Sequence, residues 1–202
     1  MKFPFFASFI VLIIWLKYEI GKADRLKAKA SDSFWDKERQ ANQVRKKPLD
    51  NLHYIEIPSD LIPRDLLTEY EAVRDSLAVI DDLNGKKIVN LNGITNTDLK
   101  LSYGTANITP LSEYDENYTK LITALYTIAS LLYENGYTGQ AVPLLEFGIM
   151  TGTDMSGYYR LLQTHYRSTK DVGKLNWLKS SAEKVEGLMK DSICRIVNEP
   201  PL

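Results

Sequence analysis

The chain has 202 residues, of which 44% are hydrophobic and 25% charged, enough for one globular domain of roughly 150 residues and an additional segment. An aromatic content of 10%, including 12 tyrosines, excludes an intrinsically disordered chain. The formal net charge of −1 hides an asymmetry, because residues 17–47 carry ten Lys and Arg against five Asp and Glu, whereas residues 48–202 are acidic. This distribution argues against nucleic acid as the main partner and favours a membrane surface that bears anionic lipid.

The first predicted element is a transmembrane anchor over residues 1–20. The uninterrupted apolar run Phe3–Leu16 would form a helix about 21 Å long, and extension through Ile20 brings it closer to the thickness of a bilayer. A cleaved signal peptide and an interfacial helix are the alternatives, but no small-residue cleavage site follows the run directly. The residues expected at the membrane interface are Trp15, Lys17, Tyr18, Lys22 and Arg25.

Orientation follows from the basic residues that flank the apolar run. Only Lys2 precedes it, whereas five Lys and Arg side chains lie between residues 17 and 29. Because cytoplasmic flanks of membrane spans carry the excess of Lys and Arg, we expect a single-pass protein of the cell membrane with a cytoplasmic C-terminal body. An extracellular body is the alternative.

Two further segments precede the body. Residues 21–47 are rich in helix formers and are predicted to be a basic juxtamembrane helical segment, either continuous with the anchor or interrupted at Ser31–Ser33. Residues 48–63 contain Pro48, Pro58 and Pro63 and are predicted to be an extended linker, with a possible short strand at 54–57.

Residues 64–110 are predicted to form one amphipathic helix that begins near Pro63 and ends at Asn84, followed by an irregular loop, 85–110, rich in Asn and Thr. A long irregular loop inside a compact domain is often functional, although Asn and Asp also satisfy backbone groups in loops. The partner-binding candidates in this loop are Asn92, Asn96, Asp98, Tyr103 and Asn107.

Apolar residues recur at helical spacing throughout residues 111–202. The pattern predicts a helix that ends at Asn135-Gly136, a shorter one that ends at Thr151-Gly152, one over about 156–169, and a single last helix over about 171–197. The predicted fold class is therefore all-α.

Small residues within residues 125–153 fall at Ala129, Gly136, Ala141 and Gly148, with separations of seven, five and seven. Ala129 and Ala141 would let two antiparallel helices pack closely, Gly136 would make the turn, and Gly148 would admit the next helix. This spacing resembles a degenerate tetratricopeptide repeat, and a shift by the usual period of about 34 residues gives partial matches over residues 159–182. The resemblance implies helical hairpins with a concave face that binds peptide segments. Generic helical hairpins are the alternative.

The order of the segments, with the stretches "YIEIP" and "LLEFGIMTGTD", also resembles a group of uncharacterised bacterial single-pass membrane proteins, which implies no activity.

No Ser/His/Asp signature, glycine-rich phosphate loop or zinc-type spacing is present in the sequence, so no catalytic, cofactor-binding or metal-binding residues are predicted. We expect a membrane-anchored helical-repeat adaptor that binds membrane lipid through residues 3–20 and a protein or peptide partner. The alternatives are an enzyme with its site in loop 85–110 and a structural subunit of a membrane complex. An adaptor should have an open groove lined by Tyr and Asn, and an enzyme a closed pocket.

Overall fold

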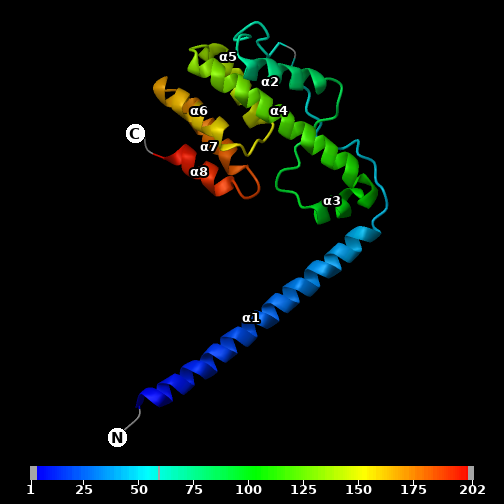
Figure 1. Ribbon diagram of the computed structural model, residues 1–202, viewed down its shortest axis with the longest axis vertical. Helices are drawn as coiled ribbons and strands as arrows, with labels where there is room; N and C mark the ends of the chain where they lie inside the picture. The colour runs from blue at the N-terminus through cyan, green and yellow to red at the C-terminus, as the bar shows by residue number, and fades with distance from the viewer. Residues whose placement is uncertain (1–3, 59, 200–202) are drawn as a thin grey trace. The chain divides into compact units, whose positions relative to one another are not determined.

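The computed structural model describes residues 4–58 and 60–199, without the side chains of residues 4–7, 26, 28 and 30. The predicted all-α class is confirmed, since the described residues contain no β-ladder beyond an isolated antiparallel bridge between Tyr54 and Val89. The expected strand at 54–57 is reduced to this bridge. Figure 1 shows the helices in chain order: α1 (Pro4–Gln43), α2 (Glu71–Asp82), α3 (Asn96–Tyr103), the 3-10 helix η1 (Thr105–Asn107), α4 (Ile108–Glu134), α5 (Thr138–Met150), α6 (Ser156–Ser168), α7 (Val172–Glu183) and α8 (Lys190–Asn198).

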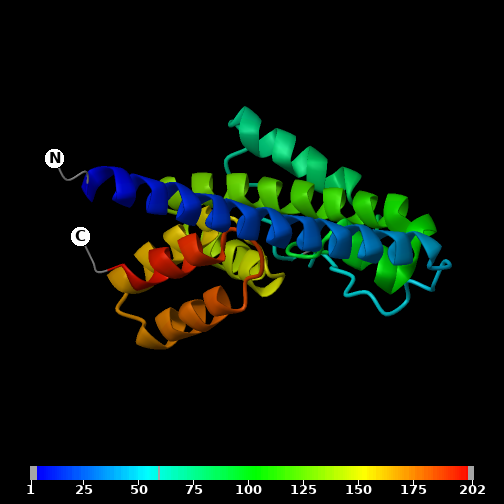
Figure 2. The same cartoon turned by 90° about the horizontal axis from the view of Figure 1, so that it is seen from below.

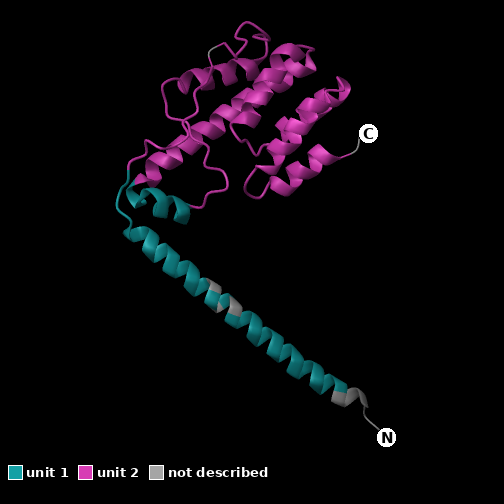
Figure 3. Cartoon of the chain, turned by 180° about the vertical axis from the view of Figure 1, so that it is seen from behind, with its two compact units in different colours: residues 1–47, 96–106 teal, residues 48–95, 107–202 magenta. Residues whose placement is uncertain are grey.

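The chain divides into two compact units that differ from the predicted segments (Figure 3). Unit 1 comprises residues 1–47 and 96–106, and unit 2 comprises residues 48–95 and 107–202. The chain thus returns to unit 1 after almost fifty residues in unit 2. Residues 96–106 belong with the end of α1, and not with the helix that precedes them in sequence.

Unit 1 consists of one 40-residue helix, α1, with α3 packed against its C-terminal end. The helix is continuous through Ser31–Ser33, so the expected interruption there does not occur. Glu38 accepts hydrogen bonds from Lys100 and from the Thr97 hydroxyl, the latter over 2.7 Å. Lys100 and then Thr97 hold the pKa of the Glu38 carboxyl below its usual value. These polar contacts of Glu38 hold α3 against α1.

The predicted membrane span, residues 3–20, extends outside the described residues, because residue 3 and the side chains of residues 4–7 are not among them. Where side chains are described, no helix is long and apolar enough to cross a membrane. Residues 9–16 are eight consecutive large apolar residues of α1, and each is between 44% and 66% exposed.

Unit 2 is built around α4, its longest helix. α2 and α5 both pack against α4, and α6, α7 and α8 follow as a set of helices in mutual contact (Figures 1 and 2). Leu121, Leu125, Leu144, Leu145 and Leu162 are fully buried. The core therefore lies between α4 and α5 and continues into α6.

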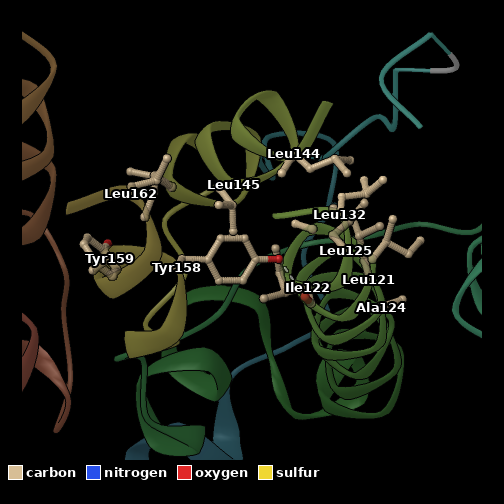
Figure 4. Packing of buried hydrophobic residues seen from close by; sticks show 14 of the residues in the cluster. Leu121, Ile122, Ala124, Leu125, Leu132, Leu144, Leu145, Tyr158, Tyr159 and Leu162 are labelled. Carbon is tan, nitrogen blue, oxygen red and sulfur yellow. Dashed lines mark hydrogen bonds between the residues drawn. The ribbon is translucent and has the colours of Figure 1, made fainter. Parts of the chain in front are cut away.

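The buried Tyr158 ring shows how α6 joins this core (Figure 4). The ring lies between Leu145 of α5 and the apolar face of α4, and its hydroxyl donates a 2.7 Å hydrogen bond to the carbonyl of Ile122. A Cβ at Gly148 would lie only 2.2 Å from Cε1 of Tyr158. The prediction that Gly148 admits the next helix is therefore confirmed.

The other small residues of the predicted repeat also occupy the expected positions. Ala129 and Ala141 are fully buried, on α4 and α5, which pack against each other. Gly136 has φ +84 in the turn that joins the two helices, a conformation that favours glycine.

The helix predicted from Pro63 begins only at Glu71, so its predicted start was wrong. Residues 64–70 form turns, and Leu67 has a positive φ of 55, which a continuous helix does not allow. The guanidinium of Arg74 donates to the carbonyls of Thr68 and Glu69 over 2.8 and 3.1 Å. These bonds stabilise the non-helical approach to α2.

The prediction that residues 85–110 form an irregular loop was also wrong, since α3, η1 and the first residues of α4 lie within this segment. The sequence signal for α3 is the spacing of Thr95 and Asp98, which is that of a capping box. α4 begins at Ile108, before Pro110, because proline is tolerated in the first turn of a helix.

The single last helix predicted over 171–197 is divided into α7 and α8. Gly187 has φ +91 in the turn between them, and a Cβ added there would lie 3.7 Å from Cα of Gly93. A Cβ at Gly93 would lie 2.6 Å from Cβ of Glu186. The break allows this turn to pack against the segment around residue 93, a long-range contact that periodicity does not encode.

Candidate functional site

The five partner-binding candidates are distributed over both units. Asn96, Asp98 and Tyr103 lie on α3 in unit 1, whereas Asn92 and Asn107 lie in unit 2. The five residues therefore do not gather into one site within either unit.

Each of these residues whose contacts are defined has a structural role within its own unit. Asp98 forms a 2.7 Å ion pair with Lys37, and the carbonyl of Tyr103 accepts a hydrogen bond from the backbone N–H of Lys47 over 3.0 Å. Asn107 is fully buried. Asn92 donates from its side chain to Asp154 over 3.0 Å.

The segment 87–92 is fixed to α4 and to the turn between α5 and α6. Asn90 donates from Nδ2 to the carbonyls of Thr151 and Gly152 over 2.8 and 2.9 Å. Asp115 of α4 accepts a 3.0 Å hydrogen bond from the backbone N–H of Leu91. Asn117, also of α4, donates to the carbonyl of Lys87 over 3.0 Å. The side-chain amides of Asn90 and Asn117 thus satisfy backbone carbonyls, as the structural interpretation of the Asn-rich sequence expected.

The same fixed segment forms part of a surface pocket of about 440 Å³ in unit 2. One wall is the extended segment 53–56, which includes Tyr54, and another is the C-terminal end of α5 with Phe147, Met150 and Thr151. The Asn90 side chain lies between these walls. Met150 is 68% exposed at the C-terminal end of α5.

A second hollow of about 260 Å³ lies on the other side of Met150. Its lining includes Trp177 and Ser181 of α7 and Lys184, which follows α7. Met150 lines both hollows, and we name the two hollows together the Met150 groove. Its lining comes from the segment 53–56, the end of α5, and α7 with the residues that follow it.

The aromatic wall of the groove is held in place before any partner binds. The Tyr54 hydroxyl donates to the carbonyl of Leu49 over 3.0 Å, and its ring packs edge-on against Tyr114 with centroids 6.1 Å apart. The ammonium of Lys87 lies 5.1 Å from the Tyr54 ring centroid and 5.7 Å from that of Tyr114. The neighbouring phenol groups of Tyr114 and Tyr54 raise the pKa of Lys87.

The opposite side of the groove is supported by contacts among α5, α6 and α7. Glu146 of α5 accepts a hydrogen bond from the Tyr166 hydroxyl over 2.6 Å and pairs with Lys174 over 2.8 Å. Lys174 in turn lies 5.3 Å from the Trp177 ring centroid. These contacts fix the helix that carries Trp177.

Sequence reasoning missed Phe147, Met150 and Trp177. A signal was present in α5, where Leu144, Leu145 and Ile149 form the buried face while Phe147 and Met150 fall on the other side of the helix. A second apolar stripe on a helix whose first stripe already fills a core indicates a further contact surface.

The predicted interface residues Trp15, Lys17, Tyr18, Lys22 and Arg25 all lie on α1 and are exposed. Over the residues that the structure describes, no group of three or more His, Cys, Asp and Glu side chains is placed to hold a metal ion.

Comparison with known proteins adds no family to these observations: no family model, no curated protein and no solved structure matches the chain.

Proposed function

We propose that the protein is a membrane-anchored adaptor whose tetratricopeptide-like body binds an extended peptide segment of a partner protein in the Met150 groove. The observation that carries this proposal is the pair of surface hollows in unit 2 that share the exposed Met150 side chain as a lining residue.

The lining of the groove supports a peptide as the occupant. Apolar and aromatic surface comes from Tyr54, Phe147, Met150 and Trp177, and the backbone and side chain of Asn90 and Thr151 add polar groups. Peptide segments are bound in open grooves through a few apolar anchors, and methionine adapts its shape to the anchor that it meets. We expect the partner segment to insert one large apolar side chain beside Met150.

The membrane part of the proposal depends on α1. A run of exposed apolar side chains on every side of a helix is unfavourable in water and is satisfied in hydrocarbon. We therefore propose that residues 3–20 hold the chain in the cell membrane and that the basic residues after them keep the body in the cytoplasm.

Peptide selection followed by mutation tests the adaptor proposal. Peptides are selected from a displayed library on the full-length protein in detergent, and their affinities are measured by fluorescence anisotropy. We expect Met150→Glu to weaken the selected peptides by more than about tenfold, because a buried charge would replace the central apolar contact.

Val172→Glu is the matched control, because Val172 is 65% exposed on α7 and borders neither hollow. Its affinities should stay at the level of the original protein. Failure to select any peptide, or peptides that bind Met150→Glu as tightly as the original protein, would contradict the proposed function.

Membrane attachment and sidedness are tested together in cells. Single cysteines at Ser31 and Ser168, in a Cys194→Ser background, are treated with a membrane-impermeant maleimide before and after lysis. We expect protein that resists alkaline extraction from membranes and is labelled only after lysis. Labelling of intact cells would place the body outside the cell.

A further inference from the structure

We infer that one face of α1 forms a binding site for the phosphate headgroup of an anionic phospholipid, a specific site that rests on the proposed membrane anchor and goes beyond it. The site consists of the four cations Lys17, Lys22, Arg25 and Lys29 around Gly21.

The four cations share one side of the helix. Lys17, Gly21, Arg25 and Lys29 recur at four-residue steps, and Lys22 follows Gly21 directly. Side chains at this spacing lie above one another on one face. Together with Tyr18 they line a hollow of about 440 Å³ on the helix surface. An added Cβ at Gly21 would meet nothing within 4 Å, so the absent side chain leaves the middle of the hollow open.

Positive charge predominates on this face of α1. All four cations are exposed, and none forms an ion pair with a carboxylate of the described chain. Glu19 and Asp24 lie at the two edges of the face, and Asp32 lies on it seven residues after Arg25, but in the part of the chain that the structure describes none of them forms an ion pair with the four cations. A phosphodiester would supply the missing charge complement.

The direction of the side chains favours a lipid as the source of that phosphate. Helical side chains tilt toward the N-terminus of their helix, which for these residues is the side of the apolar run. Arg25 lies about 7.5 Å along the axis beyond Ile20, within the depth of a headgroup layer when residues 3–20 span the hydrocarbon. Long Lys and Arg side chains then reach headgroup phosphates while their stems stay on the helix.

Lipid-selective quenching of Trp15 tests this inference. The full-length protein, with Trp35→Phe and Trp177→Phe so that Trp15 is the single tryptophan, is reconstituted in phosphatidylcholine vesicles that contain phosphatidylglycerol. Bromine is placed on the acyl chains of one lipid or the other. Trp15 precedes Lys22 by seven residues, two helical turns, so it lies on the side of the site. We expect brominated phosphatidylglycerol to quench Trp15 more strongly than brominated phosphatidylcholine.

Three variants distinguish a specific headgroup site from general electrostatic attraction between a basic helix and an anionic membrane. Arg25→Gln, at the centre of the face, should lower the preference for phosphatidylglycerol about fivefold, the effect of one cation at an anionic membrane surface. Lys27→Gln removes the same charge two residues later, on the opposite side of α1, and should change the preference much less. Gly21→Leu keeps every charge but fills the hollow, and should also lower the preference.

If the protein resists alkaline extraction, equal effects of Arg25→Gln and Lys27→Gln would overturn the headgroup site. An unchanged lipid preference in Gly21→Leu would overturn it as well. Loss of the protein from the vesicles on alkaline extraction would overturn the anchor and this inference together.

Discussion

Two regions of the chain carry dense sets of large apolar side chains, α4 with α5 in unit 2 and residues 9–16 of α1 in unit 1. In the first region, residues such as Leu121 and Leu145 are fully buried, and the remaining positions of α4 are mainly polar. In the second region the apolar residues are consecutive, and each is between 44% and 66% exposed. The helices of both regions are regular, so the two regions differ in what covers their apolar side chains.

The comparison shows that the pattern of apolar residues, more than their number, decides how a helix is covered. An apolar stripe at helical spacing can be buried by neighbouring helices of the same chain, and each Å² removed from water contributes about 25 cal/mol. A helix that is apolar on every side needs a surrounding apolar medium instead. This is the physical basis for the separate roles that we propose for α1 and unit 2.

The largest effect that we expect is the unfolding of unit 2 at alkaline pH, because its buried core contains tyrosines. Burial raises the pKa of Tyr118 from 10.0 to about 12, and it also raises the pKa values of Tyr158, Tyr159 and Tyr166. The unfolded chain releases these protons near pH 10, so their stabilising effect is fully present below pH 10 and is lost as the pH rises toward 12. Tyrosinate absorbance and circular dichroism should show unit 2 unfolding together with late ionisation. Ionisation of all tyrosines near pH 10 with the helices intact would contradict the buried cluster.

A pair of leucine variants tests the comparison directly. Leu145→Ala should lower the free energy of unfolding of unit 2 by about 2–5 kcal/mol, because it leaves a cavity beside Tyr158. Leu12→Ala removes the same atoms from a side chain that is 53% exposed on α1 and should leave this transition unchanged. Thermal unfolding in detergent measures both variants. Equal destabilisation would mean that residues 9–16 pack on protein.

Two glycine variants in α5 test how closely this helix packs against Tyr158 of α6. Gly148→Ala places a methyl group against the Tyr158 ring and should destabilise unit 2 by about 1–3 kcal/mol. Gly139→Ala, in the first turn of the same helix, meets nothing within 4 Å and should be neutral or stabilising by up to about 1 kcal/mol. Denaturant titration distinguishes the two. A neutral Gly148→Ala would show that α6 can shift away from α5.

The smallest expected effect concerns the docking of α3 in unit 1. Glu38→Gln removes the ion pair with Lys100. Lys100 lowers the pKa of Glu38 in the folded state, so the stabilising effect of Glu38 is fully present above its ordinary pKa and is lost as the pH falls through the lowered pKa. We expect lower protection factors for the α3 amides in the variant at neutral pH, and in the original protein as the pH falls through the lowered pKa of Glu38, with the intrinsic pH dependence of exchange divided out. Amides of α4 should be unaffected and serve as the internal control. Equal acceleration in α4 would contradict a separate unit.

Sequence reasoning succeeded where a local pattern has a single structural outcome. The helices over α4, α5 and α6 follow from apolar residues at three- and four-residue steps, and the turn at Gly136 and the close approach at Gly148 follow from small residues at fixed separations. It failed at Leu67 and Gly187, where the chain leaves a helical path although the apolar periodicity continues.

The candidate site could be predicted only in its general type. An open groove with Tyr and Asn was expected of an adaptor, but the residues named for it, such as Asn92 and Asp98, are used for contacts within separate units. Phe147 and Met150 were available as a second apolar stripe, whereas the approach of the segment 53–56 to α5 depends on contacts between residues almost a hundred positions apart.

The sequence by itself determined the all-α class, the positions of the helices with strict periodicity, the consecutive apolar residues of α1 and the basic face that follows them, because each of these properties depends on neighbours within a few turns of one helix. Only the tertiary structure decided that residues 96–106 return to the end of α1, that the chain breaks at Gly187 to approach Gly93, and that Met150 lies between two hollows. Those features arise from side-chain packing between segments far apart in the sequence, where the shape of one surface selects the place of the other.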